Sequence, residues 1–235
     1  MTATVVIPYR SEDPERERIF RWCLARWAAL CPDYPIITPH DGRTEGPFSF
    51  TTAANRGVVM AETGVVILAD ADTAVLHGQG EACAEAARSH PWVVGFSRFC
   101  HLAPVATSEA LTAPPDVALP QNPTGPSVRY QTWEAVCGLL AFRREDYLAI
   151  GGMDPRFQGW GWNDSSFALQ ADTLLGPRHR LPGAGLHLYH HLRPNRKSDP
   201  DARANFLLGQ RYEAADGDPE AMTLLVREHI NERVT

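Results

Sequence analysis

The sequence has no long apolar run, no Cys-x-x-Cys pair and no excess of positive charge among its 235 residues. A membrane-spanning helix needs about 20 consecutive apolar residues, so none is expected here. Residues 1–8 are too short, and lack the basic flank, to be a signal peptide. We therefore expect a cytoplasmic protein.

The charge balance is acidic, with a formal net charge of −6. A field of this sign does not attract a polyanion, so a nucleic acid partner is not expected. An anionic ligand would have to be held locally, by a metal ion, a helix N-terminus or a few arginines.

The cysteines are few, odd in number and scattered along the chain. This pattern indicates neither a zinc knuckle nor a disulfide framework. Most are expected to be reduced structural residues, because free cysteine behaves as a small buried hydrophobe. They are Cys23, Cys31, Cys83, Cys100 and Cys137.

Strand and helix patterns alternate in the first third of the chain. Short apolar runs predict strands, and apolar side chains at helical spacing predict the helices between them. These elements, strand and helix in turn, cover 4–8, 14–30, 35–38, 49–61 and 65–69. Their order indicates a parallel sheet covered by helices on both sides.

The second half is less regular. Residues 103–126 carry many prolines and no period, which predicts a long irregular loop. Two C-terminal helices are expected to begin near Pro200 and Pro219. The remaining predicted elements are strands over 92–96, 136–142 and 186–190 and helices over 143–150 and 163–174.

In such sheets, ligands gather beyond the carboxyl ends of the strands. Arg10, Asp41, Asp70 and Asp72 all fall just past predicted strand ends. This placement predicts a ligand site at that edge of the sheet.

The aspartate pair follows the apolar strand 65–69 directly. Asp70 and Asp72 lie on the same side of the chain, and two like charges so close are costly unless something neutralises them. Mg²⁺ and Mn²⁺ bind through one or two carboxylates plus substrate phosphates, so the pair predicts a divalent cation that holds a diphosphate. A solvated turn is the alternative. The haloacid dehalogenase-like phosphohydrolases also have Asp-x-Asp after a strand, but Ala74 departs from their motif.

Three segments resemble the nucleotide-binding half of the family 2 glycosyltransferases of the GT-A fold. They are Val5-Val-Ile-Pro8-Tyr-Arg10, Ala54-Asn55-Arg56-Gly57-Val-Val-Met-Ala61 and Val66-Ile-Leu-Ala-Asp70-Ala-Asp72-Thr73. The resemblance implies a nucleotide-sugar donor, with UDP favoured, and a Mn²⁺ or Mg²⁺ ion. The residues it assigns to donor binding are Pro8, Tyr9, Arg10, Asp41, Asn55, Arg56, Asp70 and Ala71.

Within that set, Asp72 is expected to bind the metal, and Asp70 is expected near the ribose and is also assigned to the metal. Asp41 is expected to contact the base. The second predicted strand here ends in Thr-Pro-His-Asp rather than in the acidic doublet usual for the family.

A second block is similar to the acceptor-side half of the β-1,4-galactosyltransferases and of related N-acetylgalactosaminyltransferases and chondroitin polymerases. It comprises Val136–Phe142, Ile150–Asp154 and Phe157–Asp164. With the first block, it implies a GT-A fold: a Rossmann-like, mainly parallel sheet flanked by helices in a single domain. The donor half would cover 1–100, the acceptor and catalytic half 101–195, and a C-terminal helical extension 196–235.

The Gly-Trp-Gly-Trp-Asn-Asp run carries the acceptor chemistry. Trp160 and Trp162 place flat aromatic rings on a flexible loop, where sugar faces can stack on them, although core packing is the alternative. Gly161 and Asn163 are assigned to the same acceptor site. Asp164, in the first turn of a helix, is our candidate for the base that deprotonates the acceptor hydroxyl, with a helix cap as the alternative. The galactosyltransferases have Glu where this chain has Asn163, so the acceptor's identity does not carry over.

Three histidines lie at the end of the strand predicted over 186–190. Relatives supply a metal ligand from a late histidine, and neutral imidazole suits Mn²⁺ better than Mg²⁺. In a strand, His187 and His190 would face opposite sides, so at most one should be a ligand. We prefer His190, with His187 in reserve. Arg193, Arg196 and Lys197 follow and either clamp a diphosphate or form a solvated basic face.

The sequence thus predicts an inverting hexosyltransferase that uses a nucleotide-sugar donor and a sugar or glycoconjugate acceptor. A sugar-phosphate nucleotidyltransferase is a second hypothesis, but the Gly-x-Gly loop of those enzymes is absent after the first predicted strand. A non-catalytic nucleotide- or carbohydrate-binding module is the third. The oligomeric state is left open.

Overall fold

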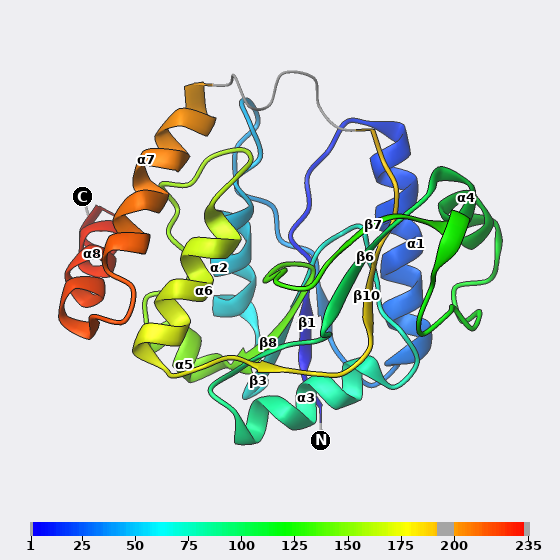
Figure 1. Ribbon diagram of the computed structural model, residues 1–235, viewed down its shortest axis with the longest axis horizontal. Coiled ribbons are helices and arrows are strands. Elements are labelled where there is room, and N and C mark those ends of the chain that lie inside the picture. Colours follow the sequence, from blue (N-terminus) through cyan, green and yellow to red (C-terminus); the bar gives the residue numbers. More distant parts are fainter. Residues whose placement is uncertain (1, 192–199, 233–235) are drawn as a thin grey trace.

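The computed structural model describes residues 2–191 and 200–232 and contains two sheets (Figure 1). The larger sheet has the strand order β2-β1-β3-β8-β5-β9. Its pairings are parallel except those of β8, which is antiparallel to both β3 and β5. The mainly parallel sheet expected from the sequence is confirmed. Its strands are β1 (Thr4–Val6), β2 (Ile36–Ile37), β3 (Val65–Ala69), β5 (Trp92–Val94), β8 (Leu139–Arg143) and β9 (His179–Arg180).

Helices cover both faces of this sheet. Figure 1 shows α1 (Pro14–Leu30) on one side of the central strands and α2 (Phe50–Met60) and α6 (Asn163–Leu174) on the other. The Asp13 side chain begins α1 by accepting a hydrogen bond of 2.8 Å from the Glu15 N–H, and Pro14 occupies the first turn, where no N–H is needed. Two further helices, α3 (Gln79–Ser89) and α5 (Arg144–Ala149), pack on β8.

The hydrophobic core is continuous across the two predicted halves. All five residues of β3 are buried, as an apolar strand with neighbours on both faces should be. The main cluster of buried side chains runs from Ala3 to Ala171 and includes residues from both sides of position 100.

A second, four-stranded sheet was not foreseen from the sequence. It has the order β4-β10-β6-β7, formed by β4 (Thr73–Ala74), β10 (Ala184–His187), β6 (Arg98–Leu102) and β7 (Val128–Thr132). Because β4 follows β3 after only three residues, this sheet begins beside the aspartate pair. The pairing places His187 opposite Thr73 on one side and His101 on the other.

The expectation of an irregular loop over 103–126 is wrong at both ends. Helix α4 (Pro104–Thr112) and a 3₁₀ turn, η1 (Gly125–Ser127), occupy them. Proline at the first position of a helix costs nothing because that N–H has no intrahelical partner, so Pro104 starts a helix here. The buried Arg26 side chain fixes the irregular part by donating to the carbonyls of Pro115 and Val117 at 2.7 and 2.9 Å.

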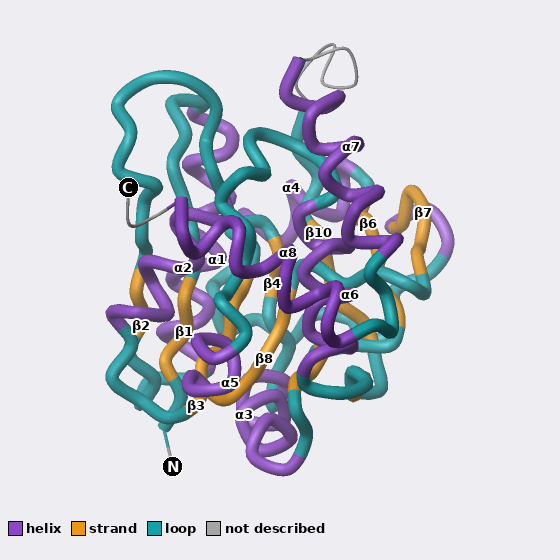
Figure 2. Tube along the Cα trace, turned by 90° about the vertical axis from the view of Figure 1, so that its left-hand side faces the viewer, coloured by secondary structure: helices purple, strands orange, loops and turns teal. Residues whose placement is uncertain are grey.

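The C-terminal helices α7 (Pro200–Ala214) and α8 (Pro219–Glu232) pack against α6, as Figure 2 shows from the side. The buried Tyr212 hydroxyl of α7 donates to the Asp154 carboxylate at 2.9 Å, which ties these helices to the loop before α6. No helix among the described residues is long and apolar enough to cross a membrane. The predicted cationic residues Arg193, Arg196 and Lys197 lie outside the described residues.

Candidate active site

The two sheets bring the aspartate pair and the late histidines together. The Asp72 carbonyl accepts a hydrogen bond of 2.8 Å from the Leu188 N–H, just past the end of β10. The strand ends at His187, so alternation no longer governs the residues that follow. His187 Nε2 lies 3.6 Å from Asp72 Oδ1, and His190 Nε2 lies 3.2 Å from Asp72 Oδ2. The expectation that the two imidazoles face opposite sides is therefore wrong.

Asp72, His187 and His190 form a group that could hold a metal ion. One ligand atom from each lies within 4.8 Å of those of the other two. A carboxylate oxygen with two imidazole nitrogens is a donor set that suits Mn²⁺, and three protein ligands leave coordination positions for a substrate. Asp70 lies outside this group.

The charges around Asp72 favour its ionised form. Burial alone would raise the pKa of this carboxyl, but His187, His190 and Arg16 together hold it below its ordinary range. Burial also lowers the pKa of His187, which favours the neutral imidazole that a metal requires. A third imidazole, His101, lies 4.8 Å from the His187 ring between ring centroids and stacks on Tyr130.

Arg16 is part of this cluster, and the sequence did not single it out. Its Nη2 lies 3.2 Å from Asp72 Oδ2, and its Nη1 lies 2.6 Å from His190 Nε2. In the sequence, Arg16 stands among alternating charges in the first turn of a helix and looks like a solvated residue. Only the position of β10 reveals its contact with the site.

Asp70 and Asp164 form the second acidic part of the site. The Asp70 carboxylate accepts a hydrogen bond of 3.1 Å from the Gly138 N–H, just before β8. Burial, followed by the charges of Asp164 and Asp72, raises the pKa of Asp70 well above its ordinary value. Burial raises the pKa of Asp164 to about 7. Three of the four carboxylates that the sequence singled out, Asp70, Asp72 and Asp164, therefore lie close enough for the charges of two of them to act on Asp70.

The tryptophan loop is held in a strained conformation before α6. Trp162 has a φ angle of +69°, a left-handed conformation that residues other than glycine rarely adopt. The Trp162 ring lies edge-to-face with Phe206 of α7, with 5.7 Å between centroids. Asn205 of α7 donates to the carbonyls of Gln158 and Trp160 at 2.7 and 3.2 Å. Helix α7 thus fixes the residues that lead into Asp164.

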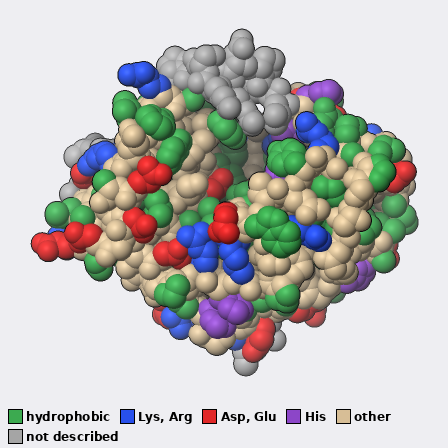
Figure 3. All heavy atoms as spheres, in the orientation of Figure 1, with side chains coloured by type: hydrophobic (Ala, Val, Ile, Leu, Met, Phe, Trp, Pro, Cys, Tyr) green, Lys and Arg blue, Asp and Glu red, His purple; other side chains and the backbone are tan. Residues whose placement is uncertain are grey.

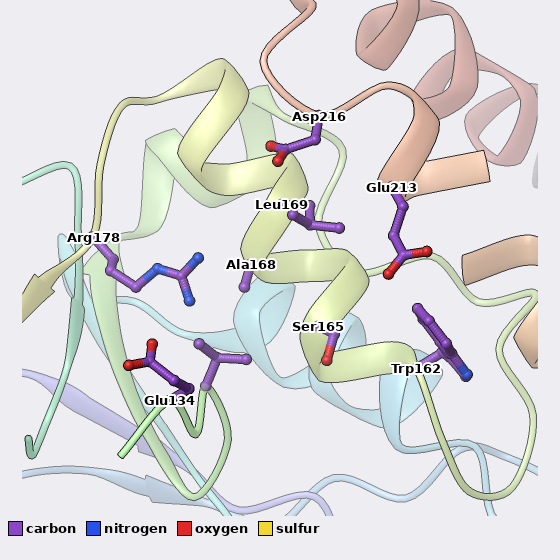
Figure 4. Close-up of a pocket in the computed structure, with 9 residues that line it drawn as sticks. Glu134, Trp162, Ser165, Ala168, Leu169, Arg178, Glu213 and Asp216 are labelled. Atoms are coloured by element: carbon purple, nitrogen blue, oxygen red, sulfur yellow. The ribbon is translucent and has the colours of Figure 1, made fainter. Parts of the chain in front are cut away.

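Two cavities flank this loop. One, of about 350 Å³, is lined by Trp160, Trp162 and Phe206, and Trp160 is 50% exposed. The other, of about 570 Å³, runs along α6 from Trp162 and Ser165 toward Asp216, as Figure 4 shows. In the space-filling view, the surface is hollowed between the α6–α7 side and the β6–β7 side (Figure 3).

Asn163 donates to Asp164 Oδ1 at 2.9 Å, so its amide orients the predicted base.

The residues predicted to bind the nucleotide lie in helix α2 and in the segments that follow β1, β2 and β3. Arg10 Nε lies 3.5 Å from Asp41 Oδ1, and Arg10 also donates to the Gly46 carbonyl at 2.7 Å. Asp41 accepts a hydrogen bond of 3.0 Å from the Ser49 N–H. These contacts shape the loop between β2 and α2. Pro8, Asp41 and Ala71 are buried, and Tyr9 stacks on Phe20 with 3.9 Å between ring centroids.

Asn55 has protein partners on both sides of its amide. It donates to the Met153 carbonyl at 2.7 Å and accepts from the Tyr147 hydroxyl at 2.7 Å and the Met153 N–H at 3.0 Å. Arg56 is exposed beside Gly42. The contacts of both residues with a nucleotide stay predictions.

Comparison with known proteins places the fold. A family model described as the N-terminal domain of galactosyltransferase matches residues 123–191, the segment from β7 to His190 and His191. The catalytic domain of Drosophila β1,4-galactosyltransferase 7 in complex with xylobiose is 15% identical with a TM-score of 0.53, over 87% of this chain and 79% of that one. No curated protein matches the chain in sequence.

Two further solved structures are similar. GalNAc-T7 with UDP, GalNAc and Mn²⁺ is 14% identical with a TM-score of 0.57, over 97% of this chain and 55% of that one. The mannosyltransferase PcManGT from Pyrobaculum calidifontis, in complex with GDP-Man and Mn²⁺, is 16% identical with a TM-score of 0.50, over 95% of this chain and 69% of that one. The chain therefore has the fold of the GT-A glycosyltransferases, which confirms the fold expected from the sequence.

Proposed function

We propose that the chain is a metal-dependent, inverting glycosyltransferase that moves a sugar from a nucleotide-diphosphate sugar to an acceptor hydroxyl. The observation that supports the proposal is the metal-binding group Asp72, His187 and His190 together with two half-buried carboxyls, Asp70 and Asp164, whose pKa values are raised. The first group can hold a cation against a diphosphate, and the second offers a carboxyl whose pKa is that of a general base.

Each residue then has a chemical task. Asp72, His187 and His190 would hold Mn²⁺, which supplies positive charge to the diphosphate as it leaves. Asp164 takes the proton of the acceptor hydroxyl as that oxygen attacks the anomeric carbon. The new carbon–oxygen bond forms as the bond to the diphosphate breaks, and a nucleoside diphosphate is released. Attack from the face opposite the leaving group inverts the anomeric centre.

The remaining predicted residues bind rather than react. Asp70 would accept a hydrogen bond from a ribose hydroxyl. Trp160 offers an exposed ring for the acceptor sugar at the rim of its cavity. The similar structures contain UDP with Mn²⁺ in one case and GDP-Man with Mn²⁺ in another, which supports a nucleotide-sugar donor and Mn²⁺ over Mg²⁺. UDP is our first choice of donor nucleotide.

The test is release of free nucleoside diphosphate from a panel of UDP- and GDP-sugars with Mn²⁺, with and without candidate acceptors. The proposal expects metal-dependent release that the Asp72→Asn variant loses. Donor binding without turnover, even when acceptors are present, would instead indicate a binding module. Release of pyrophosphate from a nucleoside triphosphate and a sugar phosphate would indicate a nucleotidyltransferase.

A further inference from the structure

The guanidinium of Arg16 occupies the space in front of two predicted metal ligands. Nη2 lies 3.2 Å from Asp72 Oδ2 and Nη1 lies 2.6 Å from His190 Nε2, so the planar group bridges the carboxylate and the imidazole. Arg16 is the third residue of α1, and its side chain is 31% exposed. It therefore reaches the site from the solvent side on a flexible stem.

The partners of His190 show which of its two ring nitrogens faces the site. A guanidinium stays protonated and can only donate hydrogen bonds. The His191 carbonyl can only accept, so His190 Nδ1, 3.0 Å away, donates to it, and Nε2 is the nitrogen that faces both Arg16 and Asp72 Oδ2, at 2.6 and 3.2 Å. A backbone carbonyl that fixes the tautomer in this way is the usual second partner of a metal-binding histidine. The lone pair that Arg16 uses is the one that a metal would need.

We infer that Arg16 is an exchangeable cation of this site. Its guanidinium and a divalent ion need the same lone pairs of Asp72 and His190, so the two cannot bind there together. Arg16 neutralises the Asp72 carboxylate before the ion binds, and the ion displaces it. The released guanidinium then lies within reach of the donor diphosphate, which it can contact with two parallel N–H groups. This last step rests on the proposed function, whereas the exchange itself does not.

The first experiment measures Mn²⁺ affinity in the absence of nucleotide, by calorimetry or by electron paramagnetic resonance of the free ion. Arg16→Gln removes the competing charge and keeps a polar side chain of similar length. We expect Mn²⁺ to bind more tightly by roughly tenfold, because a positive charge next to the ligands opposes a second one. Arg18→Gln is the matched control, since Arg18 is exposed on the same helix and its loss changes the net charge equally. An Arg16→Gln affinity equal to or weaker than that of Arg18→Gln would overturn the exchange.

Asp72→Asn establishes that the measured site is this one, because it should lose Mn²⁺ binding in the wild-type and in the Arg16→Gln background. If Asp72→Asn leaves Mn²⁺ binding unchanged, the ion binds elsewhere and the inference fails. Circular dichroism of each variant confirms that it has folded.

The second experiment measures UDP and GDP affinity at saturating Mn²⁺. Arg16→Gln should bind the nucleotide more weakly by about tenfold, in the opposite direction to its effect on Mn²⁺ alone, while Arg18→Gln should not change. Unchanged nucleotide affinity in Arg16→Gln would refute the contact with the diphosphate. If the wild-type chain binds neither nucleotide, the proposed function fails, and the exchange of Arg16 is still decided by the first experiment.

Discussion

The ring of Trp162 lies directly against Gly209 of α7: a Cβ atom at Gly209 would come within 2.3 Å of it. No side chain fits between the ring and the helix. Because Trp162 directly precedes α6, whose second residue is Asp164, this contact sets the position of the predicted base.

Gly209→Ala should therefore move the Trp162 ring and impair transfer. Alanine favours a helix over glycine by about 0.5–1 kcal/mol, but a buried overlap costs about 1–3 kcal/mol, so we expect a net loss of stability. The midpoint temperature of thermal unfolding and kcat should both fall. Gly64→Ala is the control, because a Cβ there meets nothing within 4 Å. A Gly209→Ala variant with wild-type kcat would show that Trp162 does not position the base.

The two metal-site histidines should matter equally, although the sequence alone allowed only one. His187→Ala and His190→Ala each remove an imidazole that points to Asp72, so both should weaken Mn²⁺ binding by at least about tenfold. His191→Ala is the neighbouring control, since its side chain is exposed and outside the ligand group. Calorimetric titration with Mn²⁺ gives the affinity of each of the three variants for the ion. If His187→Ala behaves like His191→Ala, His187 is not a ligand.

Asp164 should impose a pH dependence on transfer. Its carboxyl must be ionised to accept a proton, and burial raises its pKa to about 7. We expect kcat to rise with pH and level off above about 7. Asp164→Asn should keep donor binding and lose transfer; an active Asn variant would remove Asp164 from the role of base.

The same shift should appear in stability without metal. A carboxyl whose pKa is higher in the folded chain binds its proton more tightly there than in the unfolded chain, where its pKa has the ordinary value. The resulting stability is fully present below about pH 4 and is lost as the pH rises through about 7. Denaturant unfolding gives the free energy of unfolding at each pH. Between about pH 4 and 7 this free energy should decline less in Asp164→Asn than in the wild type. Asp33→Asn, at an exposed carboxylate, should follow the wild type.

Asn55 should prove important for folding. Asn55→Ala removes the hydrogen bonds of Asn55 with the Met153 carbonyl, the Met153 N–H and the Tyr147 hydroxyl, at a cost of about 0.5–1.5 kcal/mol for each. Arg56→Ala, at the exposed neighbouring position, should leave the free energy of unfolding nearly unchanged. Urea denaturation gives both values. Wild-type stability in Asn55→Ala would leave a role at the nucleotide as the reason for this residue.

Local patterns were enough to predict the elements that carry their own signal. Strand 65–69 and helices 14–30 and 163–174 end where the sequence predicts, because apolar spacing, a capping residue or a following polar run marks each end. Helix α3 was missed because its alanine-rich sequence has a weak apolar pattern.

The second sheet could not be predicted in this way, because its pairings join residues far apart in the chain. His187 pairs with His101 and Thr73. Those pairings bring His187 and His190 together at Asp72 and bring Arg16 into the site. The acidic residues of the site were easier to predict. Asp70 and Asp72 follow a predicted strand, and Asp164 lies in the first turn of a predicted helix. Their mutual proximity is a property of the folded chain alone.

Helix α7, which contacts the tryptophan loop, follows the metal-site histidines in the sequence and is therefore synthesised after them. Asp72, His187 and His190 all precede α7 in the chain, so they leave the ribosome before it. Asn205 and Gly209 come later, so the Trp160–Trp162 segment is fixed only afterwards. The residues of the predicted cation site are therefore all synthesised before those that fix the Trp160–Trp162 segment, and a chain that stops short of α7 would lack these contacts.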